Sequence, residues 1–166
     1  MIDYEKMYRA VYSRPRLASA LRLLDRAAVV FSVVAYGVLL ALSFLSSTLV
    51  GIKAIALTAV PFVLLSLFRR VLSLPRPYEV YDFGALGISA PRDKSGSSFP
   101  SRHVFSAFII GTLFLSSQPV LGAIVLLMGV ALGACRVLRG IHFIRDTIAG
   151  ALIGTICGVI GLFILM

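Results

Sequence analysis

Five arginines and both histidines of this 166-residue chain stand near the ends of apolar segments, in three clusters. The clusters are Arg69 with Arg76, then Arg102 with His103, then Arg136, Arg139, His142 and Asp146. Guanidinium groups are planar, forked donors that match phosphate oxygens. Imidazole titrates near neutrality, so it can attack phosphorus or transfer a proton. The sequence therefore predicts that the clusters meet in one phosphate-binding site with two histidines.

The run Pro100-Ser101-Arg102-His103 is expected to open an apolar helix, whose free N–H groups and positive dipole end favour an anion. Asp146 follows His142 by four residues, so on a helical face it can accept the imidazole N–H and stabilise the charged ring. Each cluster alone has a simpler interpretation, in which the arginines anchor helix ends and His142 forms a surface ion pair.

A metal site is the competing interpretation. His103, His142 and Asp146 could bind zinc, but the surrounding arginines would repel a divalent cation. The sequence therefore favours phosphate over a metal. Cys135 and Cys157 lie in apolar runs and are expected to pack as small hydrophobic side chains.

The composition predicts an integral membrane protein. The chain is 59% hydrophobic and 14% charged, with a mean hydropathy of +0.98, which excludes a disordered chain and argues against an ordinary soluble domain. Its net charge of +9 would suggest nucleic acid in a soluble protein. In so apolar a chain, the charge points instead to phosphate-bearing lipid and to membrane topology.

Apolar stretches predict an all-α bundle of about five transmembrane helices in one membrane domain, residues 1–166. The stretches are 27–52, 50–68, 104–135 and 147–166. A helix of 32 residues would overshoot a hydrocarbon layer of about 30 Å. The stretch 104–135 is therefore expected to fold back at Ser116–Pro119.

Residues 1–26 are expected to form an amphipathic segment in the membrane interface, ahead of a transmembrane core over 27–166. Apolar and aromatic residues recur there at helical spacing, at Tyr4, Met7, Tyr8, Val11 and Tyr12. Pro15 is expected to break or restart this helix.

Five spans place every basic residue except Lys53 on one side of the membrane. The positive-inside rule makes that side, with the site, cytoplasmic in the cell membrane. Gly150, Gly154 and Gly158 recur every four residues, which allows close helix packing. Packing within the chain is the favoured use of this stripe, and a homodimer is the alternative.

Three motifs resemble those of the type 2 phosphatidic acid phosphatase superfamily. The patterns of that family are Lys-x6-Arg-Pro, Pro-Ser-Gly-His and Ser-Arg-x5-His-x3-Asp. The corresponding runs here are Arg69-x6-Arg76-Pro77, Pro100-Ser101-Arg102-His103 and Cys135-Arg136-x5-His142-x3-Asp146. Three positions depart from the pattern. Arg69 replaces the lysine of the first motif, Arg102 the glycine of the second and Cys135 the serine of the third.

The resemblance implies a lipid phosphatase that needs no metal or organic cofactor. His142 would attack phosphorus, Asp146 would orient it, and His103 would protonate the leaving oxygen and then activate water. The expected phosphate-binding residues are Arg69, Arg76, Ser101, Arg102 and Arg136. The implied substrates are a prenyl diphosphate, phosphatidylglycerol phosphate, phosphatidate or a prenyl-phosphoryl sugar phosphate.

Two alternatives remain from the sequence alone. A phosphotransferase would pass the phosphoryl group from His142 to an alcohol instead of water. A non-enzymatic protein would use its arginines only to bind anionic lipid. The loop over residues 78–98 is expected to cover the pocket and to help select the lipid. Many bacterial members of the family work on the outer face of the membrane, which leaves the cytoplasmic assignment open to test.

Overall fold

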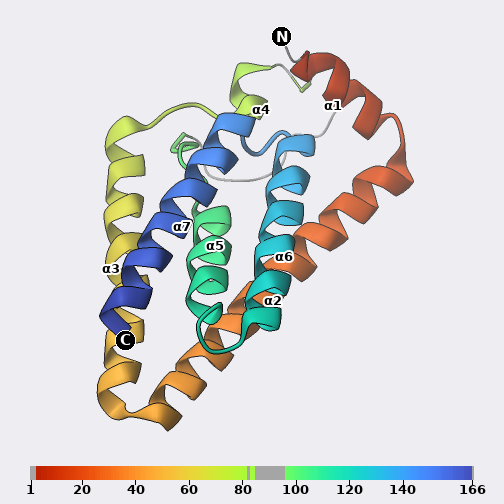
Figure 1. Ribbon diagram of the computed structural model, residues 1–166. Helices are drawn as coiled ribbons and strands as arrows, with labels where there is room; N and C mark the ends of the chain where they lie inside the picture. The colour runs from red at the N-terminus through yellow and green to blue at the C-terminus, as the bar shows by residue number, and fades with distance from the viewer. Residues whose placement is uncertain (1–2, 82, 85–95, 166) are drawn as a thin grey trace.

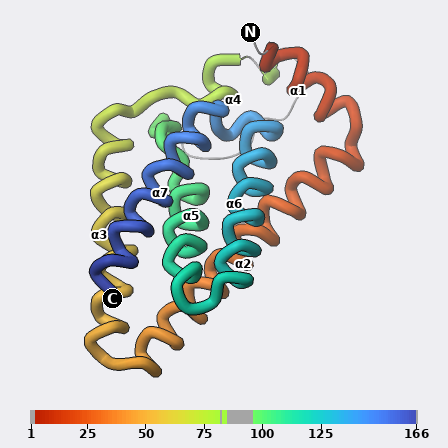
Figure 2. The backbone as a smooth tube through the Cα atoms, viewed as in Figure 1, coloured from red at the N-terminus to blue at the C-terminus, as the bar shows by residue number. Residues whose placement is uncertain are grey.

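The computed structural model describes residues 3–81, 83–84 and 96–165, and these form seven α-helices and no β-strand (Figure 1). In chain order the helices are α1 (Tyr4–Tyr12), α2 (Pro15–Ser46), α3 (Thr48–Leu72), α4 (Pro77–Val80), α5 (Arg102–Phe114), α6 (Pro119–Leu138) and α7 (Ile144–Leu165). The predicted all-α architecture is confirmed. Figure 2 shows the ends of α3 and α6 and the starts of α5 and α7 gathered at one end of the bundle, with α1 and α4 beside them.

Four helices, α2, α3, α6 and α7, are long and apolar enough to cross a membrane. The fifth predicted span, α5, has 13 residues and rises about 20 Å, less than a hydrocarbon layer of about 30 Å. The four long helices surround α5, and most of its residues are buried, so it is enclosed by protein. The predicted fold-back is confirmed, because α5 ends at Phe114 and α6 begins at Pro119.

The boundary expected between residues 26 and 27 is not a helix boundary. The helix boundary lies earlier, between the end of α1 at Tyr12 and the start of α2 at Pro15. Helix α2 then continues to Ser46 without interruption. Proline suits the first position of a helix because that position needs no N–H donor. The turn at the other end falls inside the stretch 27–52, because the Ser47 hydroxyl accepts the Val50 N–H at 3.1 Å and caps α3.

The glycine stripe of α7 packs against α5 within the chain. A Cβ at Gly150 would lie 2.6 Å from the Ser101 carbonyl oxygen, and one at Gly154 would lie 2.5 Å from that of Phe105. No side chain fits at such distances, so the two backbones touch. The favoured use of the stripe is confirmed, and the homodimer stays a prediction. This contact holds the start of α5 against the first turns of α7.

The amphipathic pattern of α1 is present, and its aromatic face packs on the same chain. Tyr8 is fully buried and Val11 is 5% exposed, while Glu5 and Arg9 lie on the exposed face. The Tyr8 ring lies 5.1 Å from the ring of Phe83, between centroids. Protein side chains therefore cover the face that the sequence analysis assigned to the membrane interface.

Candidate active site

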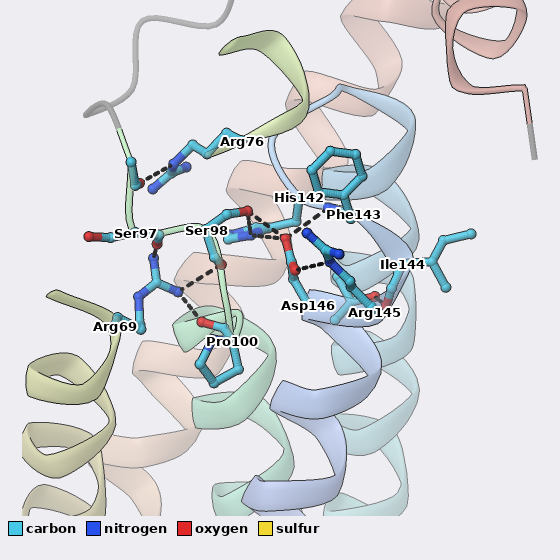
Figure 3. Close-up of polar contacts among 12 residues, drawn as sticks. Arg69, Arg76, Ser97, Ser98, Pro100, His142, Phe143, Ile144, Arg145 and Asp146 are labelled. Carbon is cyan, nitrogen blue, oxygen red and sulfur yellow. Dashed lines mark hydrogen bonds and ion pairs between the residues drawn. The ribbon is translucent and has the colours of Figure 1, made fainter. Parts of the chain in front are cut away.

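His142 and Asp146 form a buried pair at the junction of α6 and α7. His142 lies in the connecting loop and Asp146 in the first turn of α7, and their side chains are 2% and 0% exposed. The Nδ1 atom of His142 lies 3.5 Å from Oδ2 of Asp146 (Figure 3). The same oxygen accepts the Phe143 N–H at 2.9 Å. Because Nδ1 faces the carboxylate, Nε2 is the ring nitrogen left to react.

The surroundings of His142 keep its ring neutral. Burial lowers the pKa of His142 below its usual 6.5, and the hydrogen bond with Asp146 opposes this change. The guanidinium charges of Arg76 and Arg136 lower the pKa further. A neutral imidazole is the form that can attack phosphorus. Two arginines from different clusters therefore act on the same ring, as the sequence predicts.

Ser98 joins this pair, although the sequence analysis gave it no role. Its hydroxyl donates a hydrogen bond to Oδ2 of Asp146 and lies 3.4 Å from Nδ1 of His142. The side chain is buried. The only signal in the sequence was its place two residues before Pro100. Ser98 thus connects the segment before α5 to the His142–Asp146 pair and helps fix the carboxylate.

Ser101 ends that segment and caps α5. Its N–H donates to the Asp146 carbonyl oxygen at 2.9 Å, which ties the start of α5 to α7. The Ser101 side chain is fully buried, and its hydroxyl has no hydrogen-bond partner among the described residues. A buried hydroxyl without a partner is unfavourable unless a ligand completes its bonding. This environment suits the predicted phosphate contact.

Arg69, at the end of α3, binds the segment that precedes α5. Its guanidinium donates to the carbonyl oxygens of Ser97, Ser98 and Pro100 (Figure 3). One fork of donors can satisfy several carbonyls at once, which the point charge of a lysine does less well. The sequence predicts that Arg69 contacts phosphate. The structure adds a second task, since these bonds shape the loop that carries Ser98.

Arg76 is buried between α3 and α4 and is tied to the same loop. Its Nε donates to the Gly96 carbonyl at 3.1 Å, and Glu79 accepts the N–H groups of both Arg76 and Gly96 at 2.7 and 2.8 Å. These bonds fix the approach of Arg76 toward His142. Most of the loop expected to cover the pocket, residues 82 and 85–95, lies outside the described part of the chain.

Asp25 of α2 is the second site residue that the sequence analysis missed. Its carboxylate oxygens lie 3.1 Å from Nε of Arg136 and 2.6 Å from Nη1 of Arg139, and all three side chains are at most 16% exposed. A buried carboxylate therefore holds two guanidinium groups side by side. A signal was available, because Asp25 is the only acidic residue of α2 and stands at the start of its long apolar stretch, where a carboxylate indicates a partner.

Arg102 and His103 form the first turn of α5, at the same end of the bundle as His142. The Arg102 guanidinium lies over the ring of Phe62 in α3, 5.9 Å from its centroid. His103 is exposed and lines a groove between α2, α3 and α5. The groove measures about 420 Å³, and its other lining residues are largely apolar, among them Val33, Phe62, Ile109 and Ile110.

The family model of the PAP2 superfamily matches residues 32–165, most of the chain. The chain belongs to the PAP2 superfamily. Among solved structures it is similar to LpxE of Aquifex aeolicus, with 26% identity, a TM-score of 0.70, and 95% of this chain and 93% of that chain covered. It shares its fold with the first transmembrane PAP2 type phosphatidylglycerolphosphate phosphatase from Bacillus subtilis, at 24% identity, a TM-score of 0.65, and coverage of 95% and 82%. No curated protein matches the sequence.

This PAP2 protein is a membrane lipid phosphatase, a phosphoric ester hydrolase. Its departures from the family motifs have local explanations. Cys135 is buried and packs against Val11 and Leu21, as expected of a small hydrophobic residue. Arg102 turns toward Phe62 at the groove, and Arg69 braces the loop before α5. None of these positions alters the His142–Asp146 pair.

Proposed function

We propose that this PAP2 phosphatase hydrolyses a phosphate monoester or diphosphate on a lipid headgroup through a phosphohistidine at His142. The observation that carries the proposal is the buried cluster of Ser98, His142 and Asp146. Arg76 and Arg136 approach the same ring from two other segments. Such a set supplies a nucleophile, a group that orients it, and a clamp for phosphate oxygens.

In the first step, Nε2 of His142 attacks phosphorus and the bond between phosphorus and the lipid oxygen breaks. His103 donates its proton to that oxygen, so the lipid leaves as an alcohol or as a lipid phosphate. Asp146 accepts the Nδ1 hydrogen bond and stabilises the positive charge that the ring acquires. Arg76, Arg136 and Ser101 hold the phosphate oxygens, with Arg69 shaping the loop beside them.

In the second step, His103 removes a proton from water while the water oxygen attacks the phosphohistidine. The bond between nitrogen and phosphorus breaks, inorganic phosphate leaves, and His142 returns to its neutral form. The proton taken from water returns His103 to its starting form for the next cycle, since acid and base roles alternate on one group. No metal or organic cofactor takes part in this proposal.

The groove beside His103 is proposed to receive the hydrocarbon of the substrate. His103 protonates the leaving oxygen, so the leaving group must extend from the site on the side of His103. The walls there are mostly apolar and belong to α2, α3 and α5, with Leu132 of α6. An acyl or prenyl chain buries well in such a groove. Arg102, over Phe62, stands where it would contact the headgroup.

Filling the groove should separate lipid substrates from soluble ones. Ala59 lines the groove on α3, and Ala59→Phe should raise KM for a long-chain lipid phosphate by about 10-fold, which corresponds to about 1.4 kcal/mol of binding free energy. The same change should leave a soluble phosphate ester unaffected. The assay is phosphate release across the four implied lipids, in detergent without added metal.

The matched control for this test is Ala56→Phe, on the same helix, exposed like Ala59 but outside the groove. It should leave KM unchanged for every substrate. Equal KM values for wild type and Ala59→Phe on all lipids would contradict the proposed place of the hydrocarbon. A soluble headgroup phosphate hydrolysed as fast as its lipid form would contradict lipid specificity itself.

We also propose that the protein lies in the cell membrane with its site toward the cytoplasm. Apart from Lys53, which donates to the Ile164 carbonyl at the far end of the bundle, the basic residues that the structure describes lie in segments on the side of the site. Exposed serines mark the two ends, Ser13 near the site and Ser46 opposite.

In intact cells, a membrane-impermeant maleimide should label the variant Ser46→Cys. It should label Ser13→Cys only after the membrane is opened, because the cytoplasmic side is closed to the reagent before that. The wild-type chain, with Cys135 and Cys157, gives the background. The reverse labelling pattern would place the site on the outer face.

A further inference from the structure

The loop that carries His142 has a partner far away in the sequence. This loop, residues 139–143, turns through Gly140, whose φ of +72° favours glycine. Helix α1, more than 120 residues earlier, bonds to the start of the loop. The Tyr12 hydroxyl donates to the Arg139 carbonyl oxygen at 3.1 Å. Burial raises the pKa of Tyr12 above its usual 10, so this hydroxyl stays a donor at any working pH.

The far end of the loop meets α1 as well. The Ile144 N–H, a free donor at the start of α7, donates to the Tyr4 hydroxyl oxygen at 3.5 Å. The Tyr4 ring also lies edge-on to Phe143, with 5.4 Å between centroids and 88° between planes. Tyr4 and Tyr12 therefore contact both ends of the loop, with His142 between them.

Aromatic side chains fill the space between these two contacts. The buried ring of Phe83 lies so close to the loop that a Cβ at Gly140 would come within 2.5 Å of it. Tyr8 packs on Phe83 from α1, and Tyr78 donates its N–H to the Gly140 carbonyl at 3.3 Å. The loop is thus supported along its length by α1 and the residues that α1 covers.

We propose that α1 positions the nucleophile, with Tyr4 and Tyr12 as positioning residues that fix the two ends of the His142 loop. This inference rests on the proposed function of His142. A nucleophile must keep its attacking atom aligned with phosphorus, and a displacement of about 1 Å can cost about 10²-fold in rate. The proposed phosphate-binding residues lie on other segments. The contacts of Tyr4 and Tyr12 with the His142 loop should therefore affect the chemical step more than substrate binding.

The test removes single hydroxyl groups from one helix. Tyr12→Phe should lower kcat by about 10-fold, and Tyr4→Phe with Tyr12→Phe by about 10²-fold. KM, inhibition by inorganic phosphate and the thermal midpoint in detergent should stay at wild-type values. Single-turnover measurements with labelled lipid phosphate should locate the loss in the formation of phosphohistidine.

Tyr8→Phe is the matched control, because the Tyr8 hydroxyl is buried and has no hydrogen-bond partner among the described residues. It should keep wild-type kcat. Wild-type kcat for Tyr12→Phe would overturn the proposal. So would equal losses for Tyr8→Phe and Tyr12→Phe, or a fall in kcat that tracks KM and the thermal midpoint, since each indicates general packing.

The two proposals fail in different ways. If His142→Ala abolishes hydrolysis and wild type forms phosphohistidine, but Tyr12→Phe behaves as wild type, only the proposal that α1 positions His142 is wrong. If His142→Ala keeps full activity, His142 is not the nucleophile, and the proposal that α1 positions a nucleophile is rejected as well.

Discussion

His142→Ala should remove hydrolysis almost completely, lowering kcat by about 10⁴-fold or more, because the nucleophile of a covalent mechanism has no substitute. Phosphate release from a long-chain lipid in detergent measures the loss. Alkaline quenching of wild type with labelled substrate should trap a phosphohistidine, whose N–P bond survives base but not acid, and the variant should trap none. The alanine leaves the loop backbone intact, including the His142 N–H bond to the Arg136 carbonyl.

His103→Ala is the control that separates the two histidines. Loss of a general acid lowers the rate by about 10² to 10⁴-fold on a lipid alkoxide. An ester with an acidic leaving group, such as nitrophenyl phosphate, needs no proton on that group. With this ester, His103→Ala should regain most of the wild-type rate of the first step, and His142→Ala should regain none. If His142→Ala instead regained the rate with this ester, His103 would be the nucleophile and His142 the general acid. Equal activity of wild type and His142→Ala on every substrate would reject the phosphohistidine.

The second large effect is expected at Asp25. Asp25→Ala removes the carboxylate that pairs with two buried guanidinium groups, which should reduce the free energy of unfolding by about 3 to 5 kcal/mol. Asp25→Asn keeps the size of the side chain and should lower kcat/KM by about 10²-fold, because Arg136 is no longer aimed at the phosphate. Circular dichroism in detergent measures the first effect, and lipid hydrolysis measures the second.

Glu5→Gln is the matched control, since Glu5 also pairs with an arginine, but on the exposed face of α1 at 3.6 Å. It should change neither stability nor activity, as expected of an exposed ion pair. Tighter binding of vanadate by Asp25→Asn with unchanged kcat would show that the Asp25 carboxylate only reduces the net positive charge around the two arginines. That result would reject its role in positioning Arg136.

The three motifs predicted that Asp146, Arg76 and Arg136 gather near His142, because that prediction depends on residue type and local spacing. The four-residue step from His142 to Asp146 becomes a 3.5 Å contact at a helix start, and the family spacing brings Arg76 and Arg136 toward the same ring. The fold-back at Ser116–Pro119 was equally local, since turn residues interrupt an apolar run too long for one span.

The remaining features depend on contacts between distant segments, which spacing does not encode. Asp25 lies more than 100 residues from Arg136, and Ser98 acquires its role only when the loop before α5 reaches α7. The periodicity of α1 correctly indicated an apolar face. It did not distinguish lipid from Phe83 as the partner, because both accept the same aromatic surface.

Helix α2 is unusually long for a membrane span, and this has a physiological consequence. Its 32 residues rise about 48 Å, well beyond a hydrocarbon layer of about 30 Å, and Figure 1 shows it slanting behind α5 and α6. Its uncharged residues 27–46 rise about 30 Å and match that layer, so a thicker or thinner bilayer creates a hydrophobic mismatch that the helix meets by changing its tilt. Because α2 carries Asp25 and continues toward α1, the acyl composition of the host membrane should affect the position of the two arginines that pair with Asp25. Detergent micelles do not exert this force, whereas vesicles of defined chain length do.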